Sequence, residues 1–246
     1  MKASSTAEAD PNAVTKLKDR ANQELELLWR EADLNAVADG QPWRRFPWYL
    51  GQRNYSGSYW SATERAMVGY ESRLELANLI IANFDSSVKR IASQPFHLVF
   101  RAHGRTVRRT PDYLLMTANA ARVVDVKPSK QLLKDEVKQL LELTRVVVES
   151  AGLDYEIASE PDDVFLANVR FLAGYRRDWL FDHTLLDEIY GVAARNIETS
   201  IAKIVAELGK PKQTVLPGIF HLMWQHRLEA DLTKVLGNGS TVEARQ

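Results

Sequence analysis

The 246-residue sequence contains no cysteine, and this absence excludes disulfide bonds, thiolate catalysis and cysteine-ligated zinc. Any metal ion would therefore bind oxygen or imidazole. The five histidines form no His-Glu-X-X-His pattern and no glycine-rich phosphate loop is present, which argues against zinc-protease and nucleotide-binding functions. No apolar run approaches the roughly 18 residues needed to cross a bilayer, and the N-terminus is too polar for a secretory signal. We expect a cytoplasmic protein without membrane contact.

The chain also lacks net charge, because 32 Lys and Arg balance 32 Asp and Glu, so its overall field does not attract nucleic acid. The charges are unevenly distributed, however. Residues 86–111 contain six basic residues and no acidic one: Lys89, Arg90, Arg101, Arg105, Arg108 and Arg109. A local basic surface is what phosphate contact requires. A solvated loop that happens to be basic explains this strip equally well when it is taken alone.

The composition is typical of a globular protein, with 45% hydrophobic and 26% charged residues. The length allows one large domain or two modest ones. Helical periodicity covers residues 12–33, 71–84 and 130–151. Strand signals cover residues 90–101, 107–116, 122–126 and 153–159. This order of helices and strands predicts an α/β arrangement.

The two ends of the chain have a different character. Residues 1–12 are small and polar and are expected to be disordered, and residues 40–60 form an irregular segment rich in aromatic residues and arginine. After residue 162 the strand signal fades into short helices, followed by a hairpin signal at Gly237–Gly239. This order predicts a mainly α, winged-helix-like domain over 161–246. A small helical packing domain without DNA contact is the competing interpretation.

An acidic cluster with a lysine is expected in the strands. Asp125 and Lys127 are two residues apart and share a face of one strand, and the short TANAA turn would bring Asp112 of the preceding strand beside them. Glu75, on the helix before these strands, could complete the patch. Clustered carboxylates repel one another unless a cation intervenes. Mg²⁺, for which Mn²⁺ would substitute, is the simplest such cation.

This set of residues suits metal-assisted cleavage of a phosphodiester. A bound divalent ion can polarise the phosphate and lower the pKa of an attacking water, and a nearby lysine can stabilise the negative charge that develops. The competing interpretation is an exposed ion pair between Asp125 and Lys127, which would contribute little. The apolar neighbours of both residues favour the functional interpretation.

Pro111-Asp112 and Asp125-Val126-Lys127 together spell the pattern of PD-(D/E)XK nucleases. The surrounding sequence resembles the TnsA-like endonuclease subunit of heteromeric cut-and-paste transposases. The resemblance is carried by YESRLELANLIIANFDSSV, SQPF, RRTPDYLL and VVDVKPS. It covers residues 40–160, and TVLPGIFHLMWQHRLEADL resembles the winged-helix-like second domain of that family.

The resemblance implies a restriction-endonuclease-like core over 1–160 that cuts the 5′ (non-transferred) strand at transposon ends in double-stranded DNA. Its partners would be a DDE transposase, which cuts and joins the other strand, and an AAA+ transposition regulator. The implied catalytic residues are Glu75, Asp112, Asp125 and Lys127. The implied Mg²⁺ ligands are Glu75, Asp112, Asp125 and the Val126 carbonyl. The expected DNA contacts are Lys89, Arg90, Arg105, Arg108 and Arg109.

Three points stay open at this level. Glu71, one helical turn before Glu75, is the alternative acid from the helix. Gln94 and Pro95 match a family feature near the site that is expected to shape the core. Two other functions also fit the chain: a free-standing restriction or repair nuclease with no transposase, and a bridging subunit without catalysis whose C-terminal domain contacts a transposase or an AAA+ regulator.

Overall fold

The computed structural model describes residues 10, 12–44, 55–196 and 198–245. The expected disorder of 1–12 falls mostly outside the described residues, as does the middle of the irregular segment at 40–60. The end of that segment is regular, because residues 57–60 belong to a β-strand. The chain divides into an N-terminal unit, residues 1–83 with 87–160, and a C-terminal unit, residues 84–86 with 161–246. No helix in the described ranges is long and apolar enough to span a membrane.

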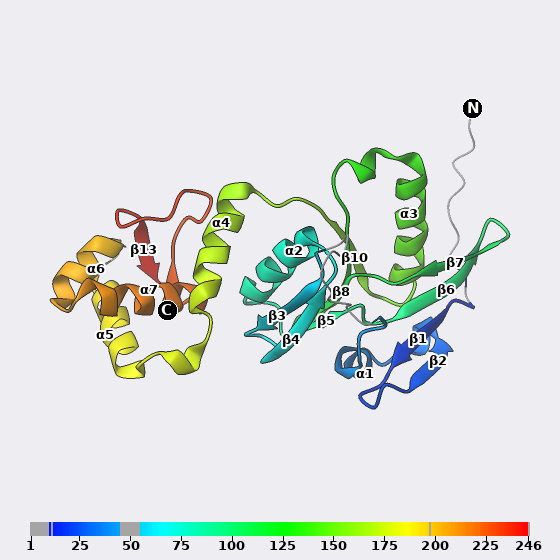
Figure 1. Ribbon diagram of the computed structural model, residues 1–246, viewed down its shortest axis with the longest axis horizontal. Coiled ribbons are helices and arrows are strands. Elements are labelled where there is room, and N and C mark those ends of the chain that lie inside the picture. Colours follow the sequence, from blue (N-terminus) through cyan, green and yellow to red (C-terminus); the bar gives the residue numbers. More distant parts are fainter. Residues whose placement is uncertain (1–9, 11, 45–54, 197, 246) are drawn as a thin grey trace. The chain divides into compact units, whose positions relative to one another are not determined.

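Two four-stranded sheets form most of the N-terminal unit (Figure 1). The first sheet is antiparallel with the order β2-β1-β6-β7, and the second has the order β10-β9-β8-β5 with β9 and β10 parallel. The strands of the first sheet are β1 (Val14–Lys18), β2 (Glu24–Leu28), β6 (His97–Ala102) and β7 (Arg105–Arg109). Those of the second are β5 (Arg90–Ser93), β8 (Tyr113–Met116), β9 (Ala121–Val126) and β10 (Asp154–Ala158). A separate hairpin joins β3 (Gly57–Ser61) to β4 (Ala66–Tyr70).

Helices cover both faces of the second sheet (Figure 1). Alternate residues of β9 belong to different cores, because side chains along a strand point to opposite faces. Val124 and Val126 pack in the core that contains Leu79 of α2 (Arg73–Phe84). Val123 packs in the core that contains Leu141 of α3 (Asp135–Glu149). The remaining helix of this unit, α1 (Leu34–Asp39), is short.

The helix expected at residues 12–33 is wrong. These residues form the β1–β2 hairpin, with a tight turn at Asp19–Asn22 in which Asn22 adopts a left-handed φ of +62°. The buried residues of β1 alternate, and the strand pairs with β6 as well as with β2. Pairing with a strand more than 80 positions away outweighs the local helical tendency, since tertiary context routinely overrides intrinsic propensity.

Both long strands expected from the sequence are divided at a bend. The run at 90–101 forms β5 and β6, and the run at 107–116 forms β7 and β8, so each run passes from one sheet to the other. At the first bend Gln94 has a left-handed φ of +43°. Its N–H donates to the Asp112 carbonyl (2.9 Å), and its side-chain oxygen accepts from the Arg44 N–H (3.2 Å). These bonds hold a strained backbone conformation and place Asp112 where the two sheets meet.

The C-terminal unit combines helices with a small antiparallel sheet of order β11-β13-β12. Its described helices are α4 (Asp163–Leu172), α5 (His183–Ala194), α6 (Ile201–Leu208) and α7 (Lys212–Trp224), and its strands are β11 (Thr199–Ser200), β12 (Leu228–Glu229) and β13 (Thr241–Ala244). The short helices expected here are confirmed. α6 ends at Gly209, whose φ of +63° suits glycine, and Pro211 precedes α7. The expected hairpin is present as the antiparallel pair β12 and β13.

Candidate active site

Asp112, Asp125 and Lys127 meet at one end of the two inner strands of the second sheet, where the bend before β8 lies beside the end of β9. The Asp112 N–H donates to the Val124 carbonyl (3.0 Å), which continues the ladder between the two strands. In the other direction, Asp112 Oδ2 accepts from the Val126 N–H at 2.6 Å. Backbone pairing therefore places the three side chains together, as the spacing of the residues predicts.

Asp125 is entirely buried, with no exposed side-chain surface. Its Oδ2 accepts hydrogen bonds from Arg109 Nη2 (2.9 Å) and from the Tyr155 hydroxyl. Its Oδ1 is buried and has no hydrogen-bond partner among the described residues. Lys127 Nζ lies 3.8 Å from Oδ1. The alternative of an exposed Asp125–Lys127 ion pair is therefore wrong, because one partner is in the protein interior.

The ammonium group of Lys127 contacts oxygen atoms of the site. Nζ donates to the Val126 carbonyl (2.9 Å) and to Asp112 Oδ2 (3.2 Å). The side chain is 23% exposed, whereas that of Asp112 is 14% exposed. Burial raises the pKa of Asp112, and the negative charge of Asp125 raises it further, while Lys127 opposes both. The ammonium thus offsets part of the repulsion between the two carboxylates.

Glu75 lies in the first turn of α2 and approaches the site from another element. Its carboxylate accepts from the Glu71 N–H (2.7 Å) and the Ser72 hydroxyl (2.9 Å), while Ser72 Oγ accepts from the Glu75 N–H (3.1 Å). This exchange is typical of a capped helix N-terminus. Burial and the charge of Asp112 raise the pKa of Glu75 from 4.5 to about 7. Glu71 precedes the helix, and Glu75 is the acid whose pKa responds to Asp112.

The raised pKa of Glu75 predicts a pH-dependent stability in the absence of divalent ions. Between pH 4.5 and 7 the folded chain retains a proton on Glu75 that the unfolded chain has released, so the contribution of Glu75 to stability is fully present below pH 4.5 and is lost as the pH rises through 7. We expect this residue to contribute about 2 kcal/mol to that fall, allowing for partial screening by solvent. Urea unfolding at pH 5 and pH 8 would measure it. Glu75→Gln should remove this part of the slope, whereas Glu142→Gln, which alters an exposed side chain of α3, should not. Equal slopes in all three chains would contradict the prediction.

The donor atoms suit a divalent ion, as two observations indicate. Asp125 Oδ1 is a buried oxygen without a hydrogen-bond partner in the described part of the chain, and a cation would satisfy it. The Val126 carbonyl and Asp112 Oδ2 already surround one cation, the Lys127 ammonium. In the described ranges no three His, Cys, Asp or Glu side chains form a metal-binding group by themselves. Mg²⁺ commonly takes one or two carboxylates and keeps several waters, so the available oxygens are sufficient.

The basic strip does not form a single surface. Lys89, Arg105 and Arg108 are exposed. Arg90 instead binds Asp39 (2.8 Å) and Glu64 (3.3 Å). The side chain of Arg109 is only 15% exposed and is committed to Asp125. The carboxylate partners already neutralise Arg90 and Arg109, so we exclude both from the DNA contacts proposed below.

Tyr155 also belongs to the site, although no motif in the sequence indicates it. It lies on β10, which pairs in parallel with β9 so that Tyr155 is opposite Val123 and on the same face as Asp125. Burial, followed by the charge of Asp125, raises the pKa of Tyr155, so its hydroxyl remains a donor. Arg145 of α3 lies over the ring at 5.1 Å and donates to the Tyr155 carbonyl (2.9 Å). The strand signal over 153–159 predicts a strand there but assigns no role to this tyrosine.

Residues 85–160 match the family model described as TnsA-like endonuclease N terminal. The matched segment is under half of the chain; it contains Asp112, Asp125 and Lys127 but begins after Glu75. No curated protein matches the chain. This match confirms the resemblance carried by the motifs: residues 85–160 are similar to the N-terminal domain of TnsA-like endonucleases.

Proposed function

We propose that the chain is a metal-dependent DNA endonuclease, the transposase subunit that cuts the 5′ strand at transposon ends by water attack on the phosphodiester. The observation that carries this proposal is the convergence of Asp112, Asp125 and Lys127 at one end of these inner strands within the segment that matches TnsA-like endonucleases. The choice of strand and of substrate rests on the resemblance to that family.

Each residue of the site has a proposed role. Asp112, Asp125 and the Val126 carbonyl would hold Mg²⁺, which when bound supplies Lewis-acid polarisation of the phosphate and a more acidic water. Glu75 is proposed as a further ligand, although the three carboxylates of the described structure do not form a metal-binding group as they stand. Asp112 Oδ2 and the Val126 carbonyl fix the Lys127 ammonium at the partly exposed side of the cluster. A compact positive charge there can orient the attacking water and stabilise the charge that develops on the phosphate oxygens.

Arg105 and Arg108 are the proposed contacts with the DNA backbone, because both are exposed on β7, an edge strand of the first sheet. We expect the Arg105→Ala/Arg108→Ala double variant to bind DNA more weakly and to reduce the salt slope of log K by about 0.9 per lost phosphate contact. Fluorescence anisotropy with labelled duplex at several salt concentrations would measure this. Arg122→Ala, which removes an exposed arginine paired with Glu156, is the matched control. An unchanged slope in the double variant would exclude these two arginines as contacts with the DNA backbone.

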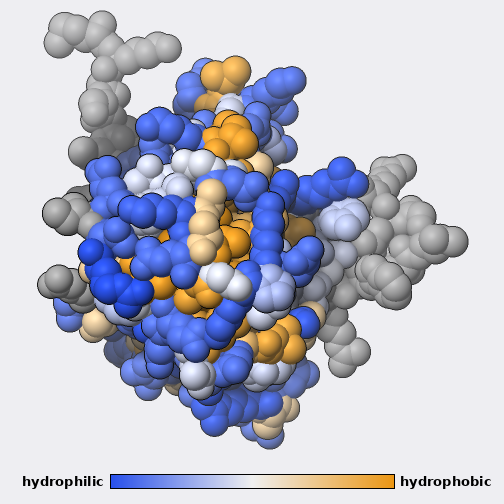
Figure 2. Space-filling view, turned by 90° about the vertical axis from the view of Figure 1, so that its left-hand side faces the viewer, coloured by the Kyte–Doolittle hydropathy of each residue, from blue (hydrophilic) through white to orange (hydrophobic). Residues whose placement is uncertain are grey.

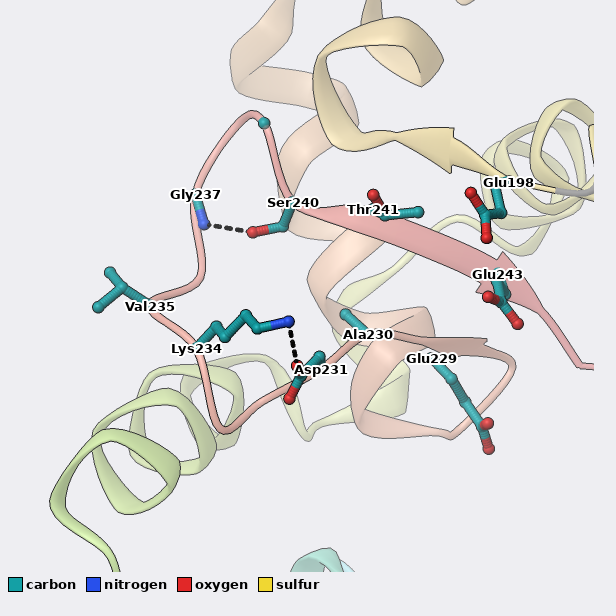
Figure 3. A pocket seen from close by; sticks show the side chains of 11 residues that line it. Glu198, Glu229, Ala230, Asp231, Lys234, Val235, Gly237, Ser240, Thr241 and Glu243 are labelled. Carbon is teal, nitrogen blue, oxygen red and sulfur yellow. Dashed lines mark hydrogen bonds and ion pairs between the residues drawn. The ribbon is translucent and has the colours of Figure 1, made fainter.

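We propose that the C-terminal unit is winged-helix-like and binds a protein partner. The succession α5, α6, α7 and the β12–β13 hairpin supports the first point. A cavity of about 750 Å³ beside the hairpin supports a protein partner over DNA. Its lining contains four carboxylates and, as the one ammonium group among the lining residues, that of Lys234 (Figure 3). The carboxylates belong to Glu198, Glu229, Asp231 and Glu243. Such a lining repels phosphate.

Exposed hydrophobic side chains on the C-terminal unit favour the same conclusion. Phe171, Trp179, Leu180 and Val235 are all at least 45% exposed. Figure 2, which views the molecule from the side where α5 and α6 lie in Figure 1, shows hydrophobic groups interspersed among hydrophilic ones. Aromatic side chains such as Phe171 and Trp179 are enriched where proteins contact one another. The proposed partners are the DDE transposase and the AAA+ regulator of the resemblance.

The proposed function is tested by incubating the purified chain with a plasmid that carries transposon ends. We expect strand cleavage in Mg²⁺ or Mn²⁺ only when a candidate DDE transposase is also present, and none after addition of EDTA. Cleavage without the transposase would favour a free-standing nuclease. Absence of cleavage in every combination would leave the bridging-subunit interpretation.

A further inference from the structure

Arg109 and Tyr155 enclose the proposed Mg²⁺ ligand Asp125 but have no assigned part in the reaction so far. We propose that Arg109 and Tyr155 are positioning residues that act through Asp125: together they fix its carboxylate so that Oδ1 faces Lys127 and the proposed metal. This inference rests on the proposed function and deepens it. The three side chains come from β7, β9 and β10, so the cluster spans both sheets.

The burial of Asp125 requires partners of this kind. A fully buried, ionised carboxylate is strongly disfavoured unless it is paired and hydrogen-bonded. Arg109 supplies the opposite charge, and Tyr155 supplies a neutral donor. Lys127 Nζ is farther away, 3.8 Å from the other oxygen. Arg109 is therefore the principal counterion of Asp125, which explains why this arginine is turned into the interior.

The two partners leave Asp125 with one available oxygen. Arg109, from β7, and Tyr155, from β10, both donate to Oδ2 of Asp125. Rotation of the carboxylate would therefore break two charge-assisted hydrogen bonds. Oδ1 is left without a hydrogen-bond partner among the described residues and lies on the side of Lys127. Groups that donate hydrogen bonds to a metal-binding carboxylate orient it, and removing them commonly weakens metal affinity. Tyr155 is itself held by Arg145, so the arrangement extends into α3.

This role differs measurably from DNA contact. A phosphate contact changes the affinity for DNA and its salt dependence. A residue that acts through Asp125 changes kcat and metal affinity and leaves the KM for DNA unchanged. Tyr155→Phe is the cleanest variant because it removes one hydroxyl and no charge. Arg109→Lys is the second variant, because it keeps the charge and removes the planar guanidinium.

The experiment compares the full chain, Tyr155→Phe, Arg109→Lys, Asp125→Asn and the double variant Tyr155→Phe/Asp125→Asn. Thr144→Val, which removes another buried hydroxyl of this unit, bonded to the Leu140 carbonyl at 2.8 Å, is the matched control. The measurements are kcat and KM for plasmid cleavage with Mn²⁺ and any required partner, Mn²⁺ binding followed by electron paramagnetic resonance, and the midpoint of urea unfolding.

For Tyr155→Phe we expect kcat about tenfold lower and Mn²⁺ affinity about tenfold weaker, with an unchanged KM for DNA. The same substitution in the Asp125→Asn chain should cause no further loss, since the two residues act as a unit. Equal losses in both backgrounds, or no loss in Tyr155→Phe, would overturn the inference while leaving the nuclease intact. An unaltered chain that binds Mn²⁺ but never cuts would refute the proposed function, and Mn²⁺ affinity would then decide the inference. A chain that neither cuts nor binds Mn²⁺ would refute both.

Discussion

Asp112→Asn should reduce DNA cleavage by about a thousandfold or more, because it removes a charge from the centre of the proposed catalytic unit. The backbone of Asp112 carries its own structural bonds, to the Val124 carbonyl and from the Gln94 N–H, and these persist in the variant. The asparagine oxygen can still accept from the Val126 N–H. Loss of activity would therefore reflect lost chemistry, since the fold keeps its local support.

Three measurements test this expectation. The initial rate of plasmid cleavage should fall to background, the affinity for duplex DNA should be unchanged or slightly greater, and the midpoint of urea unfolding should stay close to that of the unaltered chain. Asp154→Asn, an exposed aspartate at the start of β10, is the control. If Asp112→Asn cut DNA at the normal rate, the site would be wrongly assigned.

Arg109→Met should destabilise the N-terminal unit by about 3 kcal/mol, because breaking one side of a buried ion pair leaves the other charge uncompensated. The side chain of Asp125 is 0% exposed, and that of Arg109 is 15% exposed. The neighbouring Arg108→Met removes an exposed arginine and should change the free energy of unfolding by less than about 0.5 kcal/mol. Urea unfolding would measure both values.

The double variant Arg109→Met/Asp125→Leu separates stability from function. It removes both charges and fills the space with apolar atoms, so most of the lost stability should return. DNA cleavage should not return, because the proposed ligand oxygen of Asp125 is gone. A double variant that remained as unstable as Arg109→Met would show that the ion pair is not the source of the effect.

The candidate site was largely predictable from local sequence. The spacing of Asp125 and Lys127 places them on one face of β9, and the short turn after β8 brings Asp112 beside them. These relations depend only on strand period and hairpin closure, which are local properties. The basic strip was less predictable, since proximity in sequence does not reveal which arginines meet a carboxylate. Arg90 and Arg109 are paired with acids 16 or more positions away.

The sequence by itself determined the main helices, the β9 and β10 strands, the acidic cluster with its lysine and the family of residues 85–160. Only the tertiary structure decided that residues 12–33 pair as strands, that the two long strands bend from one sheet into the other, and that Arg109 and Tyr155 enclose Asp125. Periodicity and spacing report interactions within a segment, whereas strand pairing, chain bends and counterions depend on which distant segments meet. The strain at Gln94 and the burial of Asp125 both arise from such meetings, and neither leaves a pattern in the residues beside it.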